Sequence, residues 1–332
     1  MNQNFALLVL TIIFSYIYAF VGGFTDAANA IATSIGSRVL SPRVAIVMAG
    51  TLEIIGALSG TAVALTIGKG IVSLQAVSLV TVLAALIGSM LWSLFTYYWG
   101  IPVSETHGLI GALIGAAIAV SGSGSVFWHN LLPILVAIFV SPLAGFLGGA
   151  ILIGIICSFF ASQRAQRLKP VFNNLQRLSS AFMALSHGRN DAQKPMGVLV
   201  LALALYFGWE NPEIPLWVII SVGLVAGAGV AYGGWRIIKT LGMRITPLEP
   251  VQGFAAETSA ALVLQVASFL GIPVSTTHTI TSSIVGVGAA RRISCVRWGV
   301  AFDIVLSWIL TLPATIFLGF CFSKILTIFF LD

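Results

Sequence analysis

The chain has 332 residues, of which 58% are hydrophobic and only 8% are charged, and its formal net charge is +6 at pH 7. This composition cannot give a folded chain of such length a water-soluble surface of ordinary charge density, which excludes a soluble domain. The basic residues stand in short connections between apolar runs and form no aromatic-interleaved patch, so no nucleic acid partner is expected. We therefore expect an integral membrane protein whose surroundings are the lipid bilayer.

Ten apolar segments are separated by charged breaks or by breaks rich in glycine and proline. They cover residues 5–37, 43–67, 71–99, 101–121, 128–160, 178–208, 216–238, 250–270, 272–290 and 298–330. The segments are too long and too uniformly apolar for the alternation of a β-barrel, so we predict an all-α protein. About ten spans or re-entrant segments of roughly 20 residues fit this length. The fourth and ninth segments are expected to be short or re-entrant helices.

The basic residues also predict how the chain is oriented in the membrane. If the chain starts outside, twelve of its sixteen lysines and arginines face the cytoplasm, and the opposite orientation reverses this bias. The first four residues carry no side-chain charge, so we expect the first segment to remain as a span and not to be a cleaved signal peptide. We predict a multi-pass protein of the plasma (cytoplasmic) membrane with both termini outside.

Two polar motifs interrupt the apolar sequence, and each occurs twice in the same order. The first motif covers Gly23–Asn29 and returns at Gly188–Lys194, while the second covers Pro102–His107 and returns at Pro273–His278. An ionisable group at bilayer depth costs roughly 2.5 to 3.5 kcal/mol on insertion scales, so such motifs need a functional or structural reason. Their repetition in order indicates an internal duplication.

The number of segments in each half predicts how the two halves are related. Five segments per half is an odd number, so the second half must enter the membrane from the side opposite to the first. Two inverted-topology repeats with interrupted helices that meet at the midplane are a recurring architecture of secondary transporters. The predicted organisation is a first repeat over residues 1–161, a basic cytoplasmic linker over 162–177 and a second repeat over 178–332.

Some segments are expected to contain helix ends within the membrane. The segments 5–37 and 178–208 are longer than a straight span requires and carry the first motif, so we predict that both break or bend there. Pro102 and Pro273 are predicted to open helices, because proline is tolerated in the first turn and nearby Ser or Thr can cap free amides.

The second motif is typical of an anion site. A helix that begins in Ser or Thr at membrane depth offers free backbone amides, hydroxyl donors and the positive end of the helix dipole. Two such helix starts, one from each half, can converge on one oxyanion, although plain N-capping is the alternative. The candidate donors are Ser104, Thr106, Ser275, Thr276 and Thr277.

The first motif supplies the complement of an anion site. Asp26, Asn29, Asn190 and Asp191 carry hard oxygen ligands, which suit a small hard cation where a helix interruption also frees carbonyl groups. A carboxylate can instead carry a proton, because desolvation favours its neutral form. Glu53 and Glu257 add two further intramembrane acids, which either serve the cation or bond to a neighbouring helix. Arg189 and Lys194 are cations beside Asp191, which can neutralise it, reach the anion or extend to water.

Together these residues resemble the inorganic phosphate transporter family (PiT, or Pho4-type permeases). The pattern Gly-x-Asn-Asp-x-Ala-Asn, followed by Pro-Val-Ser-x-Thr-His, is found once in each half, and the likeness extends over nearly the whole chain. Thr25 stands where the family has Asn in the first copy, and Lys194 replaces the final Asn of the second. Glu53 and Glu257 match family glutamates, whereas Glu105 departs from the usual Ser or Thr.

The resemblance implies a helical transporter of inverted repeats, a homodimer, that imports phosphate with Na⁺, with protons or as a metal–phosphate complex. We therefore expect a symporter that works by alternating access, with no catalytic residues and no cofactor besides its coupling ion. The expected phosphate ligands are Thr25, Asp26, Ser104, Thr106, Asn190, Asp191, Ser275, Thr276 and Thr277. The residues expected to bind Na⁺ or carry protons are Asp26, Asn29, Glu53, Glu105, Asn190, Asp191 and Glu257.

Three other functions stay open on the sequence alone. Sulfate is a tetrahedral dianion that fits the same donors, although only phosphate still carries a proton that an acceptor carboxylate can bind at neutral pH. A membrane-embedded hydrolase would need an activated water and no ion gradient. A passive anion channel would conduct without accumulating its substrate.

Overall fold

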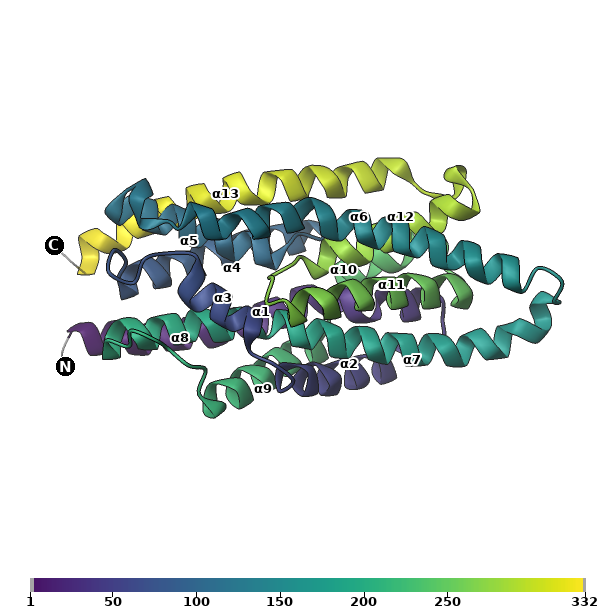
Figure 1. The fold of residues 1–332 in the computed structure, drawn as a ribbon, viewed down its shortest axis with the longest axis horizontal. Coiled ribbons are helices and arrows are strands. Elements are labelled where there is room, and N and C mark those ends of the chain that lie inside the picture. Colours follow the sequence, from purple (N-terminus) through teal and green to yellow (C-terminus); the bar gives the residue numbers. More distant parts are fainter. Residues whose placement is uncertain (1–2, 331–332) are drawn as a thin grey trace.

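The computed structural model describes residues 3–330, which form an elongated bundle of helices (Figure 1). Apart from one isolated β-bridge between Val72 and Val126, this range contains helices and their connections and no strand. Most helices run along the long axis of the bundle, and the N- and C-terminal ends lie at the same end of it (Figure 1). The predicted fold class, an all-α membrane protein, is confirmed.

The helices of the two halves follow one another in the same order. The first half contains α1 (Gln3–Gly36), α2 (Pro42–Ala57), α3 (Ala62–Gly70), α4 (Leu79–Trp99), α5 (Glu105–Ser121), η1 (Ser123–Ser125) and α6 (Trp128–Phe159). The second half contains α7 (Ala165–Asp191), α8 (Gln193–Phe207), α9 (Leu216–Tyr232), α10 (Trp235–Lys239), η2 (Thr240–Arg244), α11 (Pro250–Phe269), α12 (Thr276–Arg291), η3 (Ile293–Cys295) and α13 (Trp298–Phe330). In Figure 1, α1 and α6 run away from the end that holds the termini, whereas α7 and α13 run towards it. The repeated order and the opposite directions fit the inverted duplication that the motifs indicated.

Six spans are long and apolar enough to cross a membrane within residues 3–330, counting bent pairs as one span each. Four are the single helices α1, α4, α6 and α13, and two are pairs broken at a short connection. The axes of α2 and α3 differ by 70°, and those of α9 and the α10–η2 segment differ by 56°. The two broken pairs occupy equivalent places in the two halves.

Of the two predicted helix breaks, the one in the second half is present and the one in the first half is not. α1 runs unbroken through its motif, because that segment is rich in alanine, a strong helix former, and its polar side chains find partners on other helices. In the second half the interruption at Ala192 is slight, since this residue keeps a helical backbone (φ −65°, ψ −21°). The sharp breaks fall instead at Ser59-Gly60-Thr61 and at Gly233, whose φ of 81° favours glycine.

The predicted linker is also more ordered than a loop. Residues 165–177 are helical and continue without interruption into the rest of α7. The connection between α6 and α7 lies at the end of the bundle opposite to the termini (Figure 1).

The fourth and ninth segments are short helices, as expected. α5 has 17 residues and α12 has 16, so each is about 25 Å long, less than the roughly 30 Å of a hydrocarbon core. The first helical residue stands three positions after the proline in each case, and the residue before it is a buried Ser that caps the helix. Pro102 and Pro273 therefore precede these helices and do not form their first turn, which corrects the predicted start.

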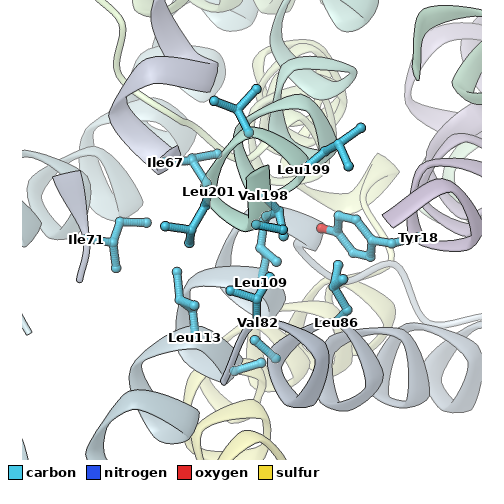
Figure 2. Close-up of a cluster of buried hydrophobic side chains, with 14 of the residues drawn as sticks. Tyr18, Ile67, Ile71, Val82, Leu86, Leu109, Leu113, Val198, Leu199 and Leu201 are labelled. Carbon is cyan, nitrogen blue, oxygen red and sulfur yellow. The ribbon is translucent and has the colours of Figure 1, made fainter. Parts of the chain in front are cut away.

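Two apolar clusters stabilise the bundle, one on each side of the motif in α1. The first cluster takes Leu7 to Ala19 from α1, and the second takes Ala27 to Ile35. Figure 2 shows part of the first cluster, in which side chains from α1, α3, α4, α5 and α8 meet around Leu109. Asp26 lies between the two clusters along α1, so the polar motif interrupts an otherwise apolar interior.

The two halves interlock through glycines. A Cβ atom on Gly115 of α5 would lie 1.9 Å from the carbonyl oxygen of Ile316 in α13. In the equivalent crossing of the other half, a Cβ on Gly286 of α12 would lie 2.1 Å from the carbonyl oxygen of Phe146 in α6. Helices approach this closely in membranes only where small residues form the contact. Each half therefore packs its short helix on the last helix of the other.

We expect Gly115→Ala to lower the melting temperature in detergent by several degrees, because its added methyl overlaps the α13 backbone. Overpacking of this kind costs about 1–3 kcal/mol. Gly154→Ala in α6 is the matched control, since no atom of residues 3–330 lies within 4 Å of its Cβ position. Equal melting temperatures for both variants would contradict the close crossing of α5 and α13.

Candidate functional site

Residues of three of the four motif copies line a small cavity beside the first apolar cluster. Its volume is about 20 Å³, which is room for a single water molecule. Its polar lining comes from α1, α2, α5, α7 and α8 and consists of Tyr18, Asp26, Glu53, Glu105, His187, Asp191 and Lys194. A larger ion enters this space only if side chains or helices move.

The N-terminus of α12 joins the two motif aspartates. The Thr276 hydroxyl donates to Asp191 Oδ2 at 2.9 Å, and the Thr277 hydroxyl donates to Asp26 Oδ1 at 3.3 Å. The Asn29 amide donates to both hydroxyl oxygens, at 3.2 and 2.9 Å. Five residues that the sequence singled out in three different segments therefore form one buried network.

A chain of charged groups extends this network towards α2. His187 Nδ1 lies 2.7 Å from Glu53 Oε2, and its Nε2 lies 3.3 Å from Asp191 Oδ2. Lys194 Nζ is 2.9 Å from Asp191 Oδ1. All four side chains are at most 9% exposed. Because charges buried at this depth are stable only when paired, these contacts hold α2, α7 and α8 together.

Glu105 of α5 also lines the cavity. Its carboxylate accepts hydrogen bonds from Thr25 at 2.9 Å and from Ser93 at 2.8 Å. The Thr25 hydroxyl is also 2.8 Å from the carbonyl oxygen of Val21, so its one proton is shared between these acceptors. In this conformation the Thr25 hydroxyl holds Glu105 in place and is not available to donate a hydrogen bond to a ligand in the cavity.

The remaining predicted anion donors form local contacts. Ser104 and Ser275 accept the backbone amides of His107 and His278, each at 3.1 Å, so both serine side chains cap their helices. The Thr106 hydroxyl donates to the carbonyl oxygen of Val274 at 2.8 Å and links the two halves. N-capping, the alternative role, is thus present, and it leaves each serine hydroxyl proton free to donate.

Asn190 bonds to its neighbours and not to the cavity. In the side-chain amide orientation that satisfies the hydrogen bonds of Asn190, its nitrogen donates to the Val274 carbonyl oxygen at 3.2 Å and to Asp191 Oδ1 at 3.3 Å. Its oxygen accepts the Ser268 hydroxyl at 3.0 Å. Asn190 therefore orients Asp191 against α11 and α12.

Glu257 belongs to a second polar cluster. Its carboxylate accepts hydrogen bonds from Thr33 at 2.5 Å, from Gln176 at 3.3 Å and from Ser179. Thr33 stands seven residues after Asp26 in α1, or about 10 Å further along the helix axis. The sequence grouped Glu257 with the other acids, whereas its contacts separate it from the central cavity.

Lys194 pairs with Asp191 as the sequence allowed, whereas two other residues of the cavity network, His187 and Tyr18, were not assigned to it from the sequence. His187 and Lys194 stand next to or within the repeated motif, but sequence spacing does not show which side of the helix faces the acids. Tyr18, Gly22 and Asp26 are spaced four residues apart, which places them on one face of a helix. This spacing could have predicted that Tyr18 faces the same cavity as Asp26. Gln193 of the same motif has a structural role, because its oxygen accepts the amides of Val63 and Ala64 at the start of α3.

The spacing of three central side chains is compatible with a small cation. One ligand atom from each of Asp26, His187 and Asp191 lies within 4.8 Å of the others. Hydroxyl, amide and carboxylate oxygens surround this group, and hard oxygen ligands suit small hard cations. The predicted acids Asp26 and Asp191 from opposite halves are therefore brought together.

A bundle of repeated membrane helices that buries paired acids and helix N-termini at its centre defines a multi-pass membrane transporter. The phosphate transporter family model matches residues 22–319, and the chain belongs to this family. Its relatives transport a solute and are not hydrolases, in agreement with the expectation that this chain is no enzyme.

Two bacterial relatives match almost end to end. A probable low-affinity inorganic phosphate transporter of Rhizobium meliloti is 44% identical, with 93% of each chain covered. One from Bacillus subtilis, described in the same words, is 39% identical over 94% of this chain and 95% of its own. A solved structure described as the sodium-dependent phosphate transporter superposes with a TM-score of 0.89 at 27% identity, covering 97% of this chain and 99% of the other.

We expect Thr276→Val to weaken uptake of labelled phosphate by roughly 5- to 150-fold, since a buried group that loses its partner costs about 1–3 kcal/mol. The variant leaves Asp191 and Asn29 each without one hydroxyl contact. Thr279→Val is the matched control, because the Thr279 hydroxyl donates to the carbonyl oxygen of Ser275 within α12. Uptake that is equal in the two variants would show that the Thr276 bridge has no part in transport.

Proposed function

We propose that this chain imports inorganic phosphate together with Na⁺ or H⁺ by alternating access. The observation that carries the proposal is the contact between Asp26 of the first half and Asp191 of the second through adjacent threonines of one helix start. The two acids can bind a cation, and the helix N-terminus beside them can bind an anion. Such a pair of sites is what symport requires.

The charges of the cavity support an order of binding. Four carboxylates line it, those of Asp26, Glu53, Glu105 and Asp191. Only two basic side chains, those of His187 and Lys194, line it within residues 3–330. Two like charges about 4 Å apart repel each other by about 4 kcal/mol at the effective dielectric constant of a partly buried site. A phosphate anion therefore binds well only after cations or protons have neutralised the acids, and this dependence couples the two fluxes.

The proposed anion donors are the hydroxyl groups and free amides at the starts of α5 and α12. Both helices begin at buried residues, Ser104 and Ser275, and their dipoles place partial positive charge there. Thr276 and Thr277 can exchange their present carboxylate acceptors for phosphate oxygens once a cation neutralises the aspartates. The cavity is too small for this exchange without movement, which is consistent with a site that opens alternately to each side.

Glu257 is proposed as a second cation or proton station. A polar path leads from it along α1 and α7, because Ser37 donates to Gln176 at 2.7 Å and Gln176 donates to Glu257. Ser37 and Arg38 border a pocket of about 720 Å³ near the α6–α7 connection. A cation or proton held at Glu257 can reach this pocket by that route.

Other parts of the proposal extend beyond the single chain. We propose a homodimer in the plasma membrane, with both termini outside and with repeats over residues 1–161 and 178–332 on either side of the stretch 162–177. The sodium dependence stated for the similar solved structure makes Na⁺ the first coupling ion to test. Competition by sulfate for uptake would favour a sulfate permease. Conductance without accumulation would favour a passive anion channel.

Uptake of labelled phosphate into proteoliposomes tests this function. With separate inward gradients of Na⁺ and H⁺, we expect phosphate to accumulate above its external concentration under at least one of them. An ionophore that collapses the gradient should stop accumulation, and excess sulfate should leave it unchanged. Absence of accumulation under both gradients would defeat the proposal.

We expect Asp191→Asn to abolish gradient-driven uptake while the protein stays folded. Removing one partner of a buried ion pair costs about 3–5 kcal/mol, which corresponds to a loss of more than about 100-fold. Asp303→Asn in α13 makes the same chemical change at an exposed position and should transport normally. Unchanged uptake by Asp191→Asn would remove this residue from the ion site.

A further inference from the structure

The two aspartate motifs are equivalent in place but differ in one residue. In the first half Asn29 follows Asp26 by three positions, and in the second half Lys194 follows Asp191 by the same interval. Residues three apart on a helix face the same side, so each pair presents its two side chains together. The cation ligands of the two halves are therefore not the same.

In the second half the carboxylate is fully engaged. Asp191 Oδ1 contacts the Lys194 ammonium at 2.9 Å, while Oδ2 accepts the Thr276 hydroxyl at 2.9 Å and lies 3.3 Å from His187 Nε2. Lys194 is only 2% exposed, and Asp191 is its one acidic partner within 4 Å in the described chain. Its ammonium is a compact single positive charge at the position where a monovalent cation would bind Asp191.

In the first half, by contrast, one oxygen atom of each motif side chain accepts no hydrogen bond from residues 3–330. Asp26 Oδ2 and Asn29 Oδ1 are both buried, and neither has a hydrogen-bond partner among residues 3–330. Asp26 is 5% exposed and Asn29 is 1% exposed. Buried oxygens rarely lack a partner in a native protein, so a pair of them on one helical turn points to a bound cation or proton that supplies positive charge.

We propose that the Lys194 ammonium is a built-in cation that permanently fills the cation site of the second half. Of the two motif aspartates, only Asp26, together with Asn29, then binds a mobile coupling cation. This inference extends the proposed symport, and its consequence for transport depends on that proposed function. It predicts that this chain couples one cation fewer to each phosphate than a chain with Asn at position 194.

The energetics explain why Lys194 stays in place through the cycle. Its charge is covalently tethered and buried, and separating it from Asp191 would leave two buried charges unpaired. A mobile cation at Asp26 is held by the same kind of oxygens but can leave to water. The lysine therefore neutralises one acid constantly, and the gradient acts through the other.

The test compares Lys194→Asn with Lys194→Arg. In proteoliposomes, the phosphate gradient that just stops net flux against a known cation gradient gives the number of cations per phosphate. We expect this ratio to increase by one in Lys194→Asn and to keep the wild-type value in Lys194→Arg, which retains the positive charge. An unchanged ratio in Lys194→Asn, or the same increase in Lys194→Arg, would overturn the inference.

A binding experiment without phosphate separates this inference from the proposed function. Purified wild type and Lys194→Asn are saturated with radioactive Na⁺, and the protons that are taken up or released are counted at the same time. We expect one additional cation equivalent per chain in Lys194→Asn, and we expect this extra equivalent to survive Asp26→Asn in the same chain. If Lys194→Asn does not fold, Lys194→Gln is measured in its place.

Equal numbers of bound cations in wild type and in the uncharged variant would disprove the built-in cation even if phosphate transport is intact. Conversely, a wild type that binds cations as predicted but accumulates no phosphate would refute the proposed function alone.

Discussion

The burial of two carboxylates from opposite halves at one point is the constraint on which the structure depends. Asp26 and Asp191 cannot remain in an apolar interior without partners, because a buried unpaired charge is far more costly than any single packing contact contributes. Their partners come from α12, which begins at this depth with Thr276 and Thr277. The short helix, the extended segment before it and the close glycine crossings all serve to bring that helix start to the aspartates.

The duplication provides two similar halves, and their differences carry the specialisation. Leu86 precedes Pro102 by the same number of residues as Glu257 precedes Pro273, so the same position is apolar in α4 and acidic in α11. Leu86 packs in the apolar cluster of Figure 2, whereas Glu257 accepts three hydrogen bonds in its own polar cluster. Asn29 and Lys194 differ in the same way. Two similar halves therefore carry different charged and polar side chains at matching positions.

Much of the fold and part of the site could be predicted from the sequence. The apolar segments, the duplication and the meeting of Asp26, Asp191 and Thr276 follow from composition and from repeated motifs, since intramembrane polar groups must find one another. The break expected in α1 was wrong, because partners on other helices satisfy its polar side chains without unwinding it. Glu257 was grouped with the central acids, since a sequence pattern shows that a carboxyl is buried but not which neighbours face it.

The sequence by itself determined that the chain is a membrane protein of helices, that its halves are repeated and inverted, and that a few polar residues carry its chemistry. These properties depend on composition and on order along the chain. Only the tertiary structure decided which donor meets which acceptor: that His187 bonds to Glu53 and lies 3.3 Å from Asp191, that Lys194 and not Arg189 pairs with Asp191, and that Asp26 Oδ2 accepts no hydrogen bond from residues 3–330. Those pairings depend on how the helices are rotated and packed, which brings together side chains more than a hundred residues apart, such as Glu53 and His187.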